Sequence, residues 1–198
     1  SPGPDYPQLP NAPVEMREIE KHFRPQDATV FARGRANAAA YLKSDPRRFA
    51  YIDFVAHGVA SRTDPLDSAI ILSRTPGSED SFKLYAREIM QHPIGARLVT
   101  IAACYGGGTR SYAGEGLVGL SWAFLRAGAH NVIGALWEVS DASAPRLMDV
   151  LYQGLQDGLP PSAALRQAKL QLLHGTGAER GEFRRPFYWG SFQLYSVQ

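Results

Sequence analysis

The sequence contains a single cysteine, Cys104, which ends the apolar run "RLVTIAAC" and stands directly before "YGGG". A histidine, His57, stands near the end of another apolar run, "FAYIDFVAHG". A cysteine acts as a nucleophile only as the thiolate, and a nearby imidazole can take the thiol proton or stabilise the resulting ion pair. If the fold brings them together, these two residues predict nucleophilic catalysis by a thiol.

Catalysis of this kind also needs N–H donors that bind the oxyanion of the tetrahedral intermediate. Gly58 follows the histidine, and without a Cβ its amide can approach a substrate closely. The amide of Cys104 is a second candidate donor, and Gly106–Gly108 would let the backbone turn sharply after it. A lone cysteine after an apolar strand is more often a small buried hydrophobic residue. The catalytic interpretation therefore depends on its pairing with His57.

Other candidate groups fit less well. Asp53 lies four residues before His57, a span of about 13 Å along a strand. We therefore favour a structural carboxylate over the third member of a catalytic triad. The stretch "GEGLVG" matches the dinucleotide-binding pattern but does not follow a strand directly, and no Cys/His spacing suggests a metal site. The remaining histidines lie late in helices, before a proline or at the start of a strand (His22, His174, His92 and His130).

The elements that must position His57 and Cys104 follow from hydrophobic patterning. Three apolar runs, 49–58, 97–104 and 130–137, read as buried strands, and 187–196 as a last strand. Strands that are apolar throughout and alternate with helices predict an α/β fold with a largely parallel sheet covered on both faces. Functional groups in such sheets gather at the C-terminal ends of the strands. Neighbouring strands lie about 4.8 Å apart, so His57 and Cys104 would meet at one edge.

Further ranges complete the expected organisation. Runs 68–74 and 82–86 read as a hairpin or as edge strands, and the expected helices cover 14–23, 35–44, 87–92, 116–128, 140–158 and 161–175. Gly128 is the expected C-cap of the helix that precedes it, and Asp141 or Ser143 the N-cap of the next. Residues 1–12 are rich in proline and read as a linker, so that 13–198 would be one domain cut from a longer protein.

Composition limits the classes of function. With 198 residues, 44% hydrophobic and 20% charged, the chain is typical of a globular domain. A formal charge of +2 gives no reason to expect a nucleic-acid partner. One cysteine forms no internal disulfide, and no apolar run reaches the roughly 18 residues of a membrane span. We therefore expect a cytoplasmic protein that does not bind membranes.

Four motifs, in order, resemble the CHAT family, a branch of the caspase-like (clan CD) cysteine peptidases. They are "FVAHGVAS", "VTIAACYGG", "GEGLVGLSWAFLRAGAHNVIGALWEVSD" and "PFYWGSFQLYS". The resemblance covers about residues 10–196 and implies a caspase-like three-layer α/β/α sandwich with a mostly parallel central sheet. It also implies His57 as the base, Cys104 as the nucleophile, and the amides of Gly58 and Cys104 as the oxyanion hole.

The function that the resemblance implies is a cysteine endopeptidase that cleaves a partner protein or its own precursor. The sequence itself indicates no cofactor and no metal, and the resemblance implies regulation by an N-terminal TPR-like repeat region. The alternative is a catalytically silent protease-like scaffold for protein–protein interaction.

Substrate selection is expected to involve the segment "LWEVSD" and the strand of the cysteine. The candidates are Trp137, Glu138, Asp141 and Ala102. Ala102 replaces the glutamine that caspases carry two places before the nucleophile, which argues against cleavage after aspartate. Glu138 or Asp141 could attract a basic side chain, although we favour a helix cap for Asp141. Asp53 stands where the family often has a second histidine.

Overall fold

The structure is a computed structural model that describes residue 6 and residues 8–61, 63–74, 81–104, 113–137, 139–175 and 181–197. Within these ranges, the side chains at 103, 104 and 113–118 are outside the description. Six strands form one sheet in the order β3-β2-β1-β4-β5-β6. The strands are β1 (Tyr51–Val59), β2 (Ala69–Ile71), β3 (Lys83–Tyr85), β4 (Leu98–Cys104), β5 (Asn131–Ala135) and β6 (Phe192–Ser196).

The centre of the sheet is parallel, as the apolar runs predict. β1 pairs with β4 in parallel, and β4 pairs with β5 in parallel. β2 and β6 run antiparallel to β1 and β5, and the β2–β3 hairpin adds a short edge. The three buried strands, the hairpin and the last strand are therefore confirmed, with boundaries that differ by a few residues.

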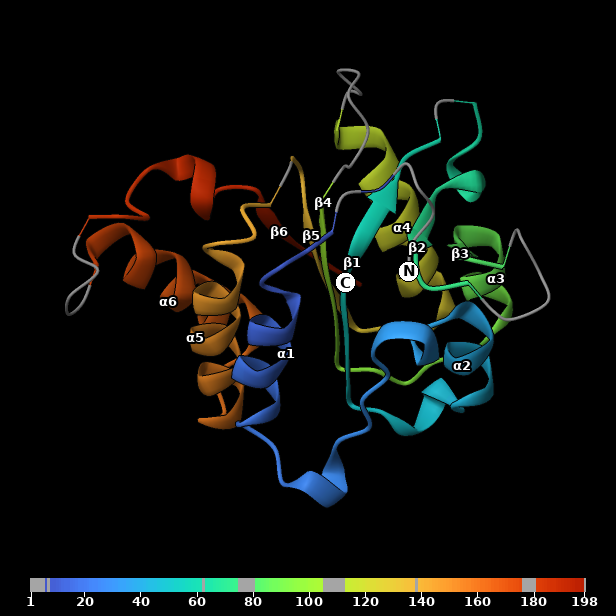
Figure 1. Cartoon of the computed structure of the whole chain (residues 1–198), viewed down its shortest axis with the longest axis horizontal. Helices are drawn as coiled ribbons and strands as arrows, with labels where there is room; N and C mark the ends of the chain where they lie inside the picture. Colours follow the sequence, from blue (N-terminus) through green and yellow to red (C-terminus); the bar gives the residue numbers. More distant parts are fainter. Residues whose placement is uncertain are drawn as a thin grey trace.

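Helices cover both faces of this sheet (Figure 1). On one face lie α1 (Ala12–Glu20), α5 (Ala144–Gln156) and α6 (Pro161–His174), and on the other α2 (Ala38–Lys43), α3 (Ala86–Gln91) and α4 (Ala113–Ala127). Two clusters of buried apolar side chains fill the two layers between sheet and helices. The expected three-layer α/β/α sandwich is confirmed. No helix in the described part of the chain is long and apolar enough to cross a membrane.

Two helix ends show how sequence and packing combine. Gly128 ends α4 with a φ of +116°, and a Cβ there would lie 2.3 Å from the carbonyl oxygen of Ile94. Only glycine fits this position, which confirms Gly128 as the expected C-cap. At the start of α5, Ser143 is the N-cap residue but makes no side-chain cap hydrogen bond. Its hydroxyl donates instead to the carbonyls of Ser140 and Tyr188.

Candidate active site

His57 and Cys104 lie on neighbouring strands in direct register. β1 and β4 pair in parallel from Tyr51 opposite Leu98 to His57 opposite Cys104. Because the strands are parallel, both residues lie at the carboxyl edge of the sheet, where chemistry concentrates in α/β proteins. Adjacent strands are about 4.8 Å apart, so the two backbones are close enough for their side chains to form a pair.

The surroundings of His57 are well packed. Its residue is 3% exposed, and its ring lies 5.8 Å from the ring of Tyr6, centroid to centroid, at an interplanar angle of 32°. On the other side, β2 places Ile71 opposite His57. The side chain of Cys104 and the predicted turn at Gly106–Gly108 lie outside the described residues. The structure therefore shows which residues surround the candidate base, and for the candidate nucleophile it shows the backbone position alone.

Gly58, the first candidate oxyanion donor, lies inside a strand. β1 continues beyond the predicted end to Val59, because β2 pairs with His57, Gly58 and Val59. Gly58 stands opposite Ile70 of β2. Its amide is therefore held by regular strand geometry at the same edge of the sheet as the amide of Cys104.

The candidate pocket residues occupy three different environments. Ala102 lies in β4, 4% exposed and opposite Val55. Trp137 follows β5, is 36% exposed and donates its indole N–H to the carbonyl oxygen of Phe187 over 3.3 Å. Glu138 lies outside the described residues.

Asp141 differs from its expected role. Its Oδ2 accepts a 2.9 Å hydrogen bond from the backbone N–H of Asn11, so it ties the start of α1 to the segment after β5. The expectation that Asp141 caps α5 is wrong, because the N-cap position belongs to Ser143. Asp141 remains close to the carboxyl edge through its position between β5 and α5.

A buried polar group lies deeper on the sheet face that carries His57. Asp53 and Thr100 are register partners, two positions along β1 and β4 before Val55 and Ala102. The hydroxyl of Tyr152 donates to Asp53 Oδ2 over 3.0 Å and lies 3.3 Å from the hydroxyl of Thr100. Burial raises the pKa of Asp53 to about 7, against the opposing effect of the Tyr152 and Thr100 hydroxyls. Asp53 is thus held by α5, which agrees with the structural role expected from the sequence.

The sequence did not single out Thr100, Tyr152 or Glu15, which lie in this group with Asp53. Glu15 of α1 is 2% exposed, and its Oε1 has no hydrogen-bond partner within the described part of the chain. Burial, and then the nearby Asp53 and Asp141 carboxylates, raise the pKa of Glu15 well above its usual value. The sequence offered one signal for the burial of Glu15, because its spacing of i, i+4 places it on the same helix face as Ile19. Among the described residues, no group of three or more His, Cys, Asp or Glu side chains is placed to hold a metal ion.

Comparison with known proteins agrees with this architecture. The chain is 32% identical to tetratricopeptide repeat protein 28 of Mus musculus and 30% identical to that of Homo sapiens, over 111 residues in each case. These alignments cover 56% of the chain and 4% of each relative, so the chain matches only a small part of those long proteins. The sequence model of the CHAT domain matches residues 3–196. The chain belongs to the CHAT domain family, with its caspase-like α/β fold.

Proposed function

We propose that this chain is a cysteine endopeptidase domain that hydrolyses peptide bonds with the dyad His57 and Cys104. The observation that supports the proposal most strongly is the register of β1 and β4, which pairs these two residues at the carboxyl edge of the sheet. The membership of the chain in the CHAT family supports the same reaction class.

In the proposed mechanism, the imidazole of His57 takes the proton of the Cys104 thiol, and the thiolate attacks the scissile carbonyl carbon. The oxyanion that forms is bound by the backbone N–H groups of Gly58 and Cys104. His57 then donates the proton to the leaving amine as the C–N bond breaks, which leaves a thioester on Cys104. Water, activated by His57, hydrolyses this acyl-enzyme and regenerates the thiol. No cofactor takes part.

Thiol reactivity tests the dyad directly, because Cys104 is the only cysteine in the chain. At pH 7 we expect iodoacetamide to alkylate the wild-type protein at least about ten times faster than His57→Ala, since the imidazole raises the thiolate fraction. His130→Ala is the matched control, because His130 is exposed and directly precedes β5, at the opposite edge of the sheet. Equal alkylation rates for wild type and His57→Ala would contradict the dyad.

Peptide-bond cleavage needs its own test. The full-length protein, incubated alone and with proteins from its source, should yield new termini that mass spectrometry detects and that Cys104→Ala abolishes. The alternative function is a silent scaffold for protein–protein interaction. Cleavage products that persist in Cys104→Ala, or a reactive thiol with no product under any condition, would favour the scaffold.

Two finer points extend the proposal. Residues 13–198 would form the peptidase domain, joined by residues 1–12 to a TPR-like region that regulates it, as the relatives named for tetratricopeptide repeats suggest.

The pocket for the residue before the cleaved bond would be lined by Trp137, Glu138, Asp141 and Ala102. A peptide library should show a preference for lysine or arginine there, and a preference for acidic or large apolar residues would contradict it.

A further inference from the structure

One edge of β1 is only partly paired. β4 covers β1 from Tyr51 to His57, whereas β2 covers its other edge only from His57 to Val59. Along Tyr51–Ala56, no described strand lies on that second edge. An open strand edge presents a row of backbone N–H and C=O groups, and such groups need partners when they are removed from water.

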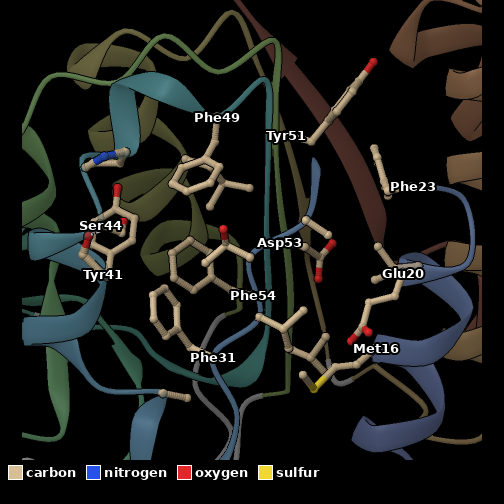
Figure 2. A pocket seen from close by; sticks show the side chains of 18 of the residues that line it. Met16, Glu20, Phe23, Phe31, Tyr41, Ser44, Phe49, Tyr51, Asp53 and Phe54 are labelled. Carbon is tan, nitrogen blue, oxygen red and sulfur yellow. Dashed lines mark hydrogen bonds between the residues drawn. The ribbon is translucent and has the colours of Figure 1, made fainter. Parts of the chain in front are cut away.

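A cavity of about 580 Å³ lies against this open edge (Figure 2). Its lining includes every residue from Phe49 to Ala56. Successive side chains of a strand point to opposite faces of the sheet. A cavity that touches every residue in a row therefore lies along the edge of the strand and not on one of its faces.

A second extended backbone lines the far side of the cavity. Ala28–Phe31 contribute to its lining, and the backbone is extended at Ala28 (φ −112°, ψ 141°) and at Ala32 (φ −133°, ψ 153°). Within the described ranges, residues 28–31 make no backbone hydrogen bond to any other segment. Two extended backbones, neither with a strand partner among the described residues on this side, therefore border the same cavity.

The side walls of the cavity are largely aromatic and apolar. In Figure 2, Phe31, Tyr41, Phe49 and Phe54 lie on one side and Met16 and Phe23 on the other, with Asp53 between them. Two lining residues also hold a buried oxygen without a described hydrogen-bond partner, Tyr41 Oη and Asp53 Oδ1. Polar backbone on two opposite sides and apolar side chains above and below are the surroundings of a central strand in a parallel sheet. A small apolar ligand would leave both backbone rows unpaired.

We propose that this cavity, which we call the strand slot, receives a further β-strand between β1 and residues 28–31, parallel to β1. The polypeptide that precedes Ser1 in the full-length protein would supply the strand. This inference does not depend on peptidase activity.

The path of the N-terminal residues supports this source and this direction. The ring of Tyr6 packs on the ring of His57, so the polypeptide passes the carboxyl end of β1 before it enters α1. A strand leading into Tyr6 from upstream would therefore end beside His57 and run parallel to β1. α1 would then return along the sheet face, as the helix of a βαβ unit does. Residues 1–12 would then join this strand to α1 within one domain, so the domain would begin upstream of Ser1 and the link to a TPR-like region would precede the strand.

The proposal specifies the missing strand. Tyr51–Ala56 extend over about 20 Å, which a strand of five or six residues matches. Both of its faces would be buried, so its sequence should be an uninterrupted apolar run. A charged or proline-rich sequence throughout the residues that precede Ser1 would overturn the proposal, as would a mature protein that begins at Ser1.

Amide hydrogen exchange at single-residue resolution tests the slot. Pairing with β4 alone protects alternate amides of Tyr51–Ala56, because alternate residues of a strand direct their N–H groups to opposite edges. We expect consecutive protection from Ile52 to Ala56 in the full-length protein, with exchange at the newly paired amides slowed at least about 100-fold relative to a chain that starts at Ser1. Protection that alternates in the full-length protein would overturn the proposal. So would equal, consecutive protection in both proteins, which would mean that residues 28–31 pair with β1 directly.

Cleavage of the folded protein tests the source of the strand. A specific protease site placed between Gly3 and Pro4 of the full-length protein separates the upstream polypeptide from residues 4–198 after folding. The two parts should co-elute on gel filtration and separate only in denaturant. A proline within the upstream apolar run should abolish this retention, and a proline just outside the run is the matched control. Free separation of the wild-type fragments, or concentration-dependent protection in the chain that starts at Ser1, which would indicate a second copy, overturns the proposal.

Discussion

At the scale of single residues, the most unusual group is the carboxyl of Asp53. It lies on a strand whose neighbouring residues are apolar, receives one hydrogen bond from Tyr152, and has an Oδ1 with no described partner. Burial is the largest cause of its pKa of about 7, compared with 3.8 for a free side chain. Glu15 of α1 is its buried acidic neighbour. Burial, and then the charge of Asp53, raise the pKa of Tyr152 well above its usual value.

This pKa implies an unusual dependence of stability on pH. Between pH 3.8 and about 7, the folded protein keeps a proton on Asp53 that the unfolded chain has released. The contribution of Asp53 to the free energy of unfolding is therefore most favourable below about pH 4 and is lost as the pH rises to about 7. Asp53→Asn should remove this loss and stabilise the protein at pH 8 by up to about 4 kcal/mol, with little effect at pH 4.

Urea unfolding of wild type and Asp53→Asn at pH 4 and pH 8 measures the difference. Asp157→Asn is a suitable control, because it changes an exposed carboxylate at the end of α5. We expect the same stability for this control and wild type at both pH values. If Asp53→Asn stabilises the protein equally at pH 4 and pH 8, the carboxyl of Asp53 is ionised in the folded wild type at both pH values.

Sequence reasoning located His57 and Cys104 because each stands at the end of an apolar run, and strand ends share an edge in parallel sheets. Their exact register could not be read from the chain, because it depends on how β1 and β4 pair. The Glu15–Asp53–Tyr152 group was not predicted, because its members come from three elements that only tertiary packing brings together.

At the scale of elements, long and strongly patterned segments were predictable and their ends were not. The apolar runs gave β1, β4 and β5, and apolar spacing gave α5. β1 extends to Val59 because β2 pairs with it, and α5 begins at Ala144 without a side-chain cap. Such boundaries depend on neighbours that are distant in the sequence. The extended backbone of residues 28–31 falls in the short apolar run "ATVFAR", but the run alone does not show which strand it would lie beside.

Two glycines with positive φ allow the cost of backbone strain to be measured separately from the cost of steric overlap. Gly128 (φ +116°) would place a Cβ 2.3 Å from the Ile94 carbonyl oxygen, whereas Gly158 (φ +86°) has nothing within 4 Å of that position. Gly158→Ala should cost about 1 kcal/mol of unfolding free energy, from backbone strain alone. Gly128→Ala should cost at least twice as much, because the junction of α4 and β5 must also move. Urea unfolding measures the loss of unfolding free energy in both variants. Equal losses would mean that the backbone at Ile94 moves away from the new Cβ at no cost in free energy.

At the scale of the whole molecule, the N-terminal residues lie against the candidate active site. Tyr6 covers His57, and the Asn11 amide is held by Asp141 in the segment after β5. α1 then packs on α5, where Lys21 and His22 both contact the Asp149 carboxylate over 2.9 and 2.8 Å. Whatever precedes Tyr6 is therefore attached close to the edge that carries the dyad. From the sequence, regulation was expected only because of the resemblance to the CHAT family. The contact between Tyr6 and His57 could not be read from the sequence, because it exists only in the folded chain.

The Tyr6–His57 contact makes the coupling testable. An aromatic pair contributes about 0.5–1.5 kcal/mol, so its loss should raise the accessible fraction of the dyad by about two- to twelve-fold. Tyr6→Ala in the full-length protein should therefore increase the rate of Cys104 alkylation, and of any self-cleavage, by a factor in that range. Trp122→Ala, which removes an exposed aromatic side chain from α4, should leave both rates unchanged. If Tyr6→Ala also leaves them unchanged, the polypeptide before α1 does not control access to His57, and regulation must reach the dyad through β1 and β4 themselves.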